Sequence, residues 1–115
     1  MLRKENRLST TYEFNKVRRL GRKVRTPLFD LFYLDNKNPE TPTRIGVVVS
    51  NKFSPVAPKR NRVKRIFREM LRLEMEKLPN GYWLVVHPNH TSVEKNHEEI
   101  RAEINKVLSK IPFSH

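Results

Sequence analysis

The stretch PKRNRVKRIFREMLRLEMEKL, residues 58–78, decides the fold because it is a long segment with one apolar and one basic side. Pro58 is tolerated in the first turn of a helix, where its missing N–H has no intrahelical partner. Residues 79–81, Pro-Asn-Gly, end the helix. A projection at about 100° per residue gathers the apolar side chains on one arc: Val63, Ile66, Phe67, Met70, Leu71 and Leu78. The stretch therefore predicts a helix over 58–78 that buries this arc against a sheet.

The opposite face of this predicted helix is basic. Asn61, Arg65, Arg68 and Arg72 follow one another at i, i+4, i+7 and i+11, and only Glu69 interrupts them. Like charges at this spacing repel by a few tenths of a kcal/mol, and guanidinium groups suit bidentate contacts with phosphate. The face therefore favours a bound polyanion, with a simply solvated face as the alternative. Further cations flank its first turns: Lys59, Arg60, Arg62 and Lys64.

Three apolar runs outside this helix predict strands, over residues 28–34, 44–50 and 82–87. The first two are expected to pair antiparallel, because only the loop of residues 35–43 separates them.

Two further helices are predicted at the ends of the chain. Thr10 and Glu13 fit a capping box for a helix over 9–20, after which Gly21 suits the left-handed conformation. Thr91 and Glu94 fit a second capping box for a helix over 92–111. His97 falls on the apolar arc of that last helix and is expected to be partly buried.

The element order helix, strand, strand, helix, strand, helix predicts an α+β two-layer sandwich, with helices packed on a small mixed sheet. The 115 residues suffice for one core, so residues 1–115 are expected to form a single domain. The absence of cysteine excludes disulfides and thiolate metal sites. No apolar run reaches the roughly 18 residues of a membrane span, and no signal peptide is visible, so a cytoplasmic location without membrane contact is expected.

The net charge of +12 is concentrated in two segments. Residues 1–25 carry nine basic and two acidic side chains, residues 52–72 carry eight and one, and the rest is close to neutral. Such concentration costs self-repulsion and indicates a polyanionic partner, nucleic acid before anionic lipid.

Catalysis by side chains is not indicated. Metal-dependent phosphoryl chemistry needs clustered carboxylates, and Asp30, Asp35 and Glu40 are scattered over a strand and a loop. His87 and His90 lack a third ligand. We therefore predict no catalytic residue and no tightly bound cofactor or metal.

The run Arg60-Asn61-Arg62-Val63-Lys64-Arg65-Ile66-Phe67-Arg68-Glu69 resembles the RNR signature of the bacterial ribonuclease P protein subunit. The similarity extends to Arg7-Leu8, Glu13-Phe14 and Gly21 near the N-terminus, and to the strand and following residues 44–52. The chain departs from the family pattern at residues 53–58, which lack the usual glycine and extra basic residues, at Arg18, where an aromatic is common, and at His87, where Arg or Lys is common.

This resemblance implies a ribosomal protein S5-like fold with a left-handed βαβ crossover. It also implies partnership with a catalytic RNA that removes the 5′ leader from precursor tRNA, with Mg²⁺ bound by the RNA of the holoenzyme. The protein alone is expected to be monomeric. The alternative is a structural, ribosomal-type RNA-binding protein without a catalytic partner.

The resemblance also assigns residues to two sites. A cleft between the first helix and the sheet is implied to hold the single-stranded leader, with Phe14 and Phe32 as the aromatic residues and Lys16 and Arg18 as the cations. Aromatic faces and cations are what single-stranded nucleic acid requires, although Phe14 fits ordinary core packing equally well. The RNA-contacting set, with the region of Asn61 proximal to metal, is Lys52, Lys59, Arg60, Asn61, Arg62, Lys64, Arg65, Arg68 and Arg72.

Overall fold

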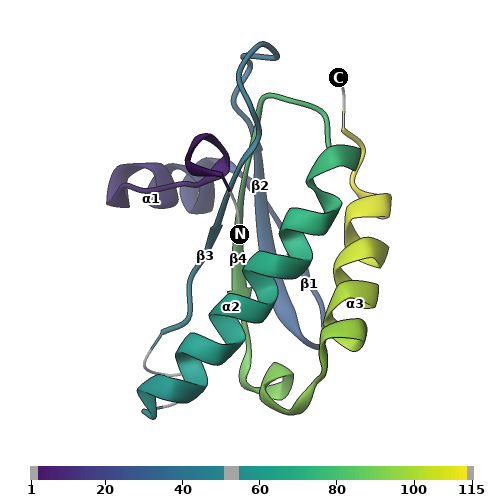
Figure 1. The fold of residues 1–115 in the computed structure, drawn as a ribbon. Helices are drawn as coiled ribbons and strands as arrows, with labels where there is room; N and C mark the ends of the chain where they lie inside the picture. The colour runs from purple at the N-terminus through teal and green to yellow at the C-terminus, as the bar shows by residue number, and fades with distance from the viewer. Residues whose placement is uncertain (1–2, 51–54, 114–115) are drawn as a thin grey trace.

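Four strands and three helices make up the fold in the computed structural model, which describes residues 3–50 and 55–113. The strands form one mixed sheet in the order β1-β2-β4-β3 (Figure 1). In chain order the elements are α1 (Thr11–Leu20), β1 (Arg22–Arg25), β2 (Phe29–Asp35), β3 (Arg44–Val47), α2 (Ala57–Glu74), β4 (Tyr82–Pro88) and α3 (His97–Lys110). Short 3-10 turns lie at η1 (Lys4–Asn6), η2 (Met75–Lys77) and η3 (His90–Glu94). The α+β class and the mixed sheet with packed helices are confirmed.

The predicted antiparallel pair of β2 and β3 is wrong, because β4 lies between them. β4 runs antiparallel to β2 and parallel to β3. Val85 and Val86 are both fully buried although they point to opposite faces, so this strand needs a covered central position. The loop before β3 crosses the start of β4. There the Asn36 N–H donates to the Gly81 carbonyl and the Gly81 N–H donates to the Thr41 carbonyl, each at 2.9 Å.

The segment β3-α2-β4 is a βαβ unit, since its two strands are parallel neighbours joined through α2. The left-handed sense of this crossover stays a prediction. The expected helix over 58–78 corresponds to α2 and the 3-10 turn η2 that continues it. Pro58 occupies its first turn as expected.

Helices α2 and α3 lie side by side on one face of the sheet, which we call the inner face (Figure 1). The predicted arc of α2 is buried there apart from Leu78, which is half-buried. Phe67 packs edge-on against Phe29 of β2, with ring centroids 5.6 Å apart. Helix α1 contacts β2 and β4 through a separate apolar cluster around Val17 and Val85. The sheet and the helices α2 and α3 therefore form the two predicted layers. Helix α1 partly covers the opposite face of the sheet, which we call the outer face.

Strand β1 was not predicted, because Arg22-Lys23-Val24-Arg25 has one apolar residue and no usable alternation. It forms by antiparallel pairing with β2 at the edge of the sheet. Charged side chains are common on such edges, where they discourage pairing with other chains. The Thr26 hydroxyl closes the turn between the strands by hydrogen bonding the Phe29 carbonyl at 2.8 Å.

The two ends of α1 differ in how well they match the prediction. The Thr10–Glu13 capping box is present. Gly21 ends α1 in an extended conformation, with φ −82°, and not in the left-handed one. It is needed for space, since a Cβ there would lie 2.5 Å from the Val17 carbonyl oxygen and 2.6 Å from that of Tyr33.

Helix α3 begins later than predicted. Residues 90–94 form η3, and the capping box is Asn96 with Glu99, whose N–H donates to the Asn96 side chain at 2.8 Å. Ser92 is buried and hydrogen bonds the Asn89 carbonyl, which holds this segment as a separate turn. His97 is consequently the first residue of α3 and is exposed, so its predicted partial burial is wrong.

Candidate nucleic-acid interface

Helix α1 is fixed on the outer face by its first turn. Glu13 accepts hydrogen bonds from the backbone N–H groups of Ser9 and Thr10 and an ion pair from Arg44 of β3, with Nη1 and Oε2 2.9 Å apart. Burial alone would raise the pKa of Glu13, but these hydrogen bonds and Arg44 lower it below its usual value. The carboxylate therefore ties the start of α1 to the edge of the sheet.

Phe14 depends on a glycine opposite it. A Cβ at Gly46 of β3 would lie 2.2 Å from the Phe14 ring, so the ring occupies the space that any other residue would fill. Phe14 is partly buried against the cluster of Leu8, Val17 and Val85. It therefore packs on the sheet while part of its ring stays accessible.

Cations and rings alternate next to Phe14 on the outer face. The Arg18 guanidinium lies 6.0 Å from the Phe14 ring centroid, and its Nη1 is 3.2 Å from Nε2 of His87. The His87 ring meets Phe32 edge-on at 5.6 Å. Lys23 Nζ lies 5.5 Å from the Phe32 centroid and 3.6 Å from the Asp30 carboxylate. We call these five residues, Phe14, Arg18, Lys23, Phe32 and His87, the outer-face cluster.

The neutral form of His87 is favoured in this cluster. Burial and then the positive charge of Arg18 lower the pKa of His87 below its usual value, against a smaller opposite effect of Asp30. Since a guanidinium only donates hydrogen bonds, the contact with Arg18 requires an unprotonated Nε2.

The structure brings three of the four predicted cleft residues together, namely Phe14, Arg18 and Phe32. Lys16 lies elsewhere on the same face, with Nζ 5.2 Å from the Trp83 ring centroid and 3.3 Å from Oδ1 of Asn36. Sequence reasoning missed Lys23 and His87 as neighbours of Phe32. The alternation Trp83, Val85, His87 along β4 was the signal that could have placed His87 on this face.

The predicted basic face of α2, which we call the basic stripe, is largely accessible; it consists of Asn61, Arg65, Arg68 and Arg72. Asn61, Arg65 and Arg68 are exposed, whereas Arg72 is half-buried and pairs with Glu69 at 2.6 Å. Hydrogen bonds, the largest effect being that of Arg72, lower the pKa of Glu69 to about 2. Arg62 donates from Nη1 to the Val93 carbonyl at 3.2 Å, so this nitrogen is engaged in a contact within the protein. Lys59 is exposed, Arg60 and Lys64 are half-buried, and Lys52 lies outside the described residues.

The described residues also bear on metal sites and membrane spans. Within residues 3–50 and 55–113, no group of three or more His, Asp or Glu side chains is placed to hold a metal ion. His87 contacts Arg18, and His90 is exposed on η3. Over the same described ranges, no helix is both long and apolar enough to cross a membrane.

Comparison with known proteins decides the family. The family model described as Ribonuclease P matches residues 2–112. The chain belongs to the Ribonuclease P family. The Ribonuclease P protein component of Pseudanabaena sp. (strain PCC 6903) is 35% identical over 115 residues, covering 100% of this chain and 98% of the relative. That of Clostridium botulinum (strain Loch Maree / Type A3) is 34% identical, covering 93% and 95%.

Solved structures of this family share the fold. The RNase P protein from Thermotoga maritima superposes with a TM-score of 0.80 at 26% identity, covering 93% of this chain and 98% of that one. The Staphylococcus aureus RNase P protein gives a TM-score of 0.80 at 23% identity, over 92% of this chain and 94% of that one, which supports the fold alone. The resemblance drawn from the RNR run is therefore confirmed.

Proposed function

We propose that this member of the Ribonuclease P family binds a catalytic RNA and the 5′ leader of precursor tRNA, and thereby assists Mg²⁺-dependent removal of the leader. The observation that carries the proposal is the outer-face cluster, where aromatic rings and cations stand together on a sheet face that α1 covers only in part. Stacking of a base on such a ring contributes about 1–3 kcal/mol.

The two basic and aromatic surfaces have separate tasks in this proposal. The exposed Arg65 and Arg68 of α2 are suited to the phosphates of a folded RNA, because guanidinium groups make strong, bidentate, charge-assisted hydrogen bonds. The remaining members of the proposed RNA-contacting set are those that the resemblance assigns: Lys52, Lys59, Arg60, Asn61, Arg62, Lys64 and Arg72. The outer-face cluster, with Phe14 and Phe32, is suited to an unpaired strand such as the leader.

A structural ribosomal-type RNA-binding protein is the second candidate. It would share the basic α2 and the fold class. It has no use for accessible rings flanked by cations, so the outer-face cluster favours the leader-binding role.

The chemistry is assigned to the RNA partner. Mg²⁺ prefers oxygen ligands, chiefly carboxylates and phosphates, and the described residues offer no acidic cluster that could hold it. Asn61 is exposed on α2, and its region would lie near a metal ion bound by the RNA. The protein without RNA is proposed to be monomeric and, in the cell, cytoplasmic.

The first test asks whether the protein cuts RNA by itself. The purified chain, freed of nucleic acid, is expected to leave precursor tRNA intact with Mg²⁺, and cleavage at the mature 5′ end is expected once the catalytic RNA is added. Site-specific cleavage by the RNA-free protein that is lost on changing His87 or a carboxylate would overturn the proposal.

A second test addresses α2. Replacing Arg65 and Arg68 together by Ala should leave the fold intact and weaken assembly with the catalytic RNA equally for every substrate, with a log–log salt slope shallower by about 2. The matched control is the pair Lys106→Ala and Lys110→Ala, which removes the same charge from exposed positions on α3. Equal behaviour of the two double variants would contradict the role of α2.

A further inference from the structure

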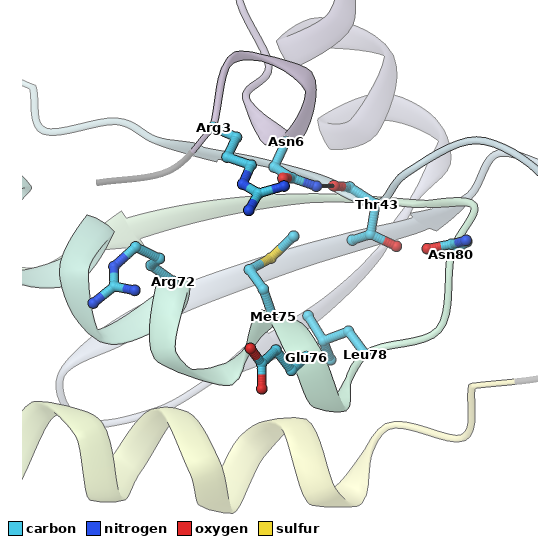
Figure 2. Close-up of a pocket in the computed structure, with 8 residues that line it drawn as sticks. All are labelled: Arg3, Asn6, Thr43, Arg72, Met75, Glu76, Leu78 and Asn80. Carbon is cyan, nitrogen blue, oxygen red and sulfur yellow. Dashed lines mark hydrogen bonds between the residues drawn. The ribbon is translucent and has the colours of Figure 1, made fainter.

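The N-terminal segment before α1 is attached to the free edge of β3. The backbone N–H of Leu8 donates to the Ile45 carbonyl at 3.1 Å, and Arg7 forms a parallel bridge with Ile45. Nδ2 of Asn6 donates to the Thr43 carbonyl at 3.0 Å (Figure 2). These anchors use backbone groups and an amide, so the charged side chains of the segment are left for other contacts.

Two cavities lie between this segment and α2. One, of about 700 Å³, is lined by Lys4 and Arg7 from the segment, Arg44 from β3 and Arg68 from α2, among others. The other, of about 390 Å³, lies between Arg3 and Asn6 on one side and Arg72, Met75 and the carboxylate of Glu76 on the other. Figure 2 shows Arg3 pointing from the segment toward α2. Arg3 of one cavity precedes Lys4 of the other in the chain, and Arg72 follows Arg68 by about one turn of α2, so the cavities succeed one another along the same two walls. We call them together the N-terminal groove.

The cations of this groove differ in how far they are already neutralised. Arg44 pairs with Glu13 at 2.9 Å, Arg72 with Glu69 at 2.6 Å, and Arg3 approaches Glu5 at 3.8 Å. Lys4, Arg7 and Arg68 form no ion pair with any residue in the described ranges, and all three are exposed. Positive charge therefore remains on both walls of the larger cavity, whose one carboxylate among the described residues, Glu5, lies near Arg3. This arrangement costs self-repulsion unless an anion enters.

The groove suits a chain of phosphates better than a single small anion. Its cations come from two separate walls, it is several hundred Å³ in volume, and it continues the stripe that carries Arg65. A sugar-phosphate backbone lying along α2 would reach the groove at Arg68, which belongs to both the stripe and the larger cavity.

We propose that the N-terminal groove binds the backbone phosphates of the same folded RNA that lies along α2, with Lys4 and Arg7 on one wall and Arg68 on the other. This inference rests on the proposed function. It adds a second wall to the RNA site, built from a segment that precedes α1 in the sequence and lies outside the RNR run.

The test is the double variant Lys4→Gln with Arg7→Gln in the full chain, measured as affinity for the catalytic RNA. Assembly should weaken on the order of tenfold or more, since charged hydrogen bonds are lost, and the salt slope should become shallower by about 2. Thermal stability should be unchanged. The preference for precursor tRNA with a long leader over leaderless tRNA should also be unchanged, because the outer-face cluster is intact.

Lys106→Gln with Lys110→Gln on α3 is the control of equal charge, and it should leave affinity near that of the wild type. If the Lys4/Arg7 variant matches this control while Arg65→Ala with Arg68→Ala still weakens assembly, the groove is overturned and the proposed function stands. If the α2 variant also matches the control, the proposed function itself fails.

A second variant tests the two walls together. Arg68→Gln and Arg7→Gln, singly and combined, should show losses that do not add, because both side chains would contact one stretch of backbone. Independent, additive losses for the two walls would contradict a shared groove.

Discussion

The two faces of the four-stranded sheet carry similar aromatic and aliphatic residues but differ in what covers them. On the inner face Phe29, Leu31 and Leu84 are at most 1% exposed beneath α2 and α3. On the outer face Phe14, Phe32 and Trp83 are only partly buried, and cations lie against their rings. The difference teaches that the inner face supplies stability and the outer face is available to a ligand.

The largest effect is expected from the inner face. Phe67→Ala removes a fully buried ring that packs on Phe29, and it should lower the free energy of unfolding by about 3–5 kcal/mol. Urea unfolding measures this loss. Tyr12→Ala, at a ring that is 66% exposed on α1, should change the same quantity by less than about 0.5 kcal/mol. Equal losses at the two positions would break the comparison.

The second largest effect on stability is expected at a buried carboxylate between α2 and α3. Glu74 of α2 receives hydrogen bonds or ion pairs from Arg101 at 3.3 Å, Asn105 at 3.2 Å and Lys77 at 3.3 Å. Burial alone would raise the pKa of Glu74, but these partners lower it below 4.5. The contribution of ionised Glu74 to the free energy of unfolding is therefore complete above about pH 4.5, and it is lost as pH falls through the folded-state pKa.

Glu74→Gln should accordingly cost roughly 1.5–3 kcal/mol at pH 7, and the difference from wild type should shrink in acid. Unfolding at pH 7 and at pH 3 checks both statements. Glu103→Gln, on the same helix as Arg101, is the comparison variant and should show no such dependence. A cost for Glu74→Gln that is the same at both pH values would refute the assignment.

The smallest effect is expected on the outer face, at His87. Its pKa is lowered by burial and by Arg18, so between that pKa and the usual 6.5 the unfolded chain binds more protons than the folded one. Stability should therefore fall as pH drops through 6.5. His87→Gln should remove part of this fall between pH 7.5 and 5.5, while His90→Gln, at an exposed position, should not. A His87→Gln variant with the full wild-type pH response would show that His87 is not held neutral.

The sequence predicted those parts of the fold that have a local pattern and missed those that depend on strand pairing. The apolar arc of α2, the Thr10–Glu13 capping box and three of the four strands follow from local pattern, because burial against one face imposes a period on the sequence. The position of β4 between β2 and β3 did not follow, since loop length alone does not reveal which strand takes the centre. Strand β1 exists only through its pairing with β2 and has no pattern of its own.

The candidate site divides likewise. The RNR run is contiguous, so its residues could be named from the sequence. The outer-face cluster joins α1, β1, β2 and β4, and the contacts of Arg18 with His87 and of Lys23 with Phe32 depend on the strand order that sequence reasoning had wrong. Lys16 lies two residues after Phe14, and residues at this spacing do not share a helix face. Its side chain therefore turns toward Trp83.

We propose that one face of β2 serves the core and the other serves a ligand, and two phenylalanines three residues apart test this division most directly. Phe29→Ala and Phe32→Ala make the same chemical change on opposite faces of this strand. The unfolding free energy of each variant is measured on the free protein. Each variant is then assembled with the catalytic RNA, and the affinities of the complex for long-leader precursor tRNA and leaderless tRNA are measured. Phe29→Ala should lose about 3–5 kcal/mol of stability and keep the leader preference. Phe32→Ala should lose far less stability, and its affinity for the long-leader substrate alone should fall about five- to a hundredfold. A Phe32→Ala protein destabilised as much as Phe29→Ala, with unchanged leader preference, would contradict the account.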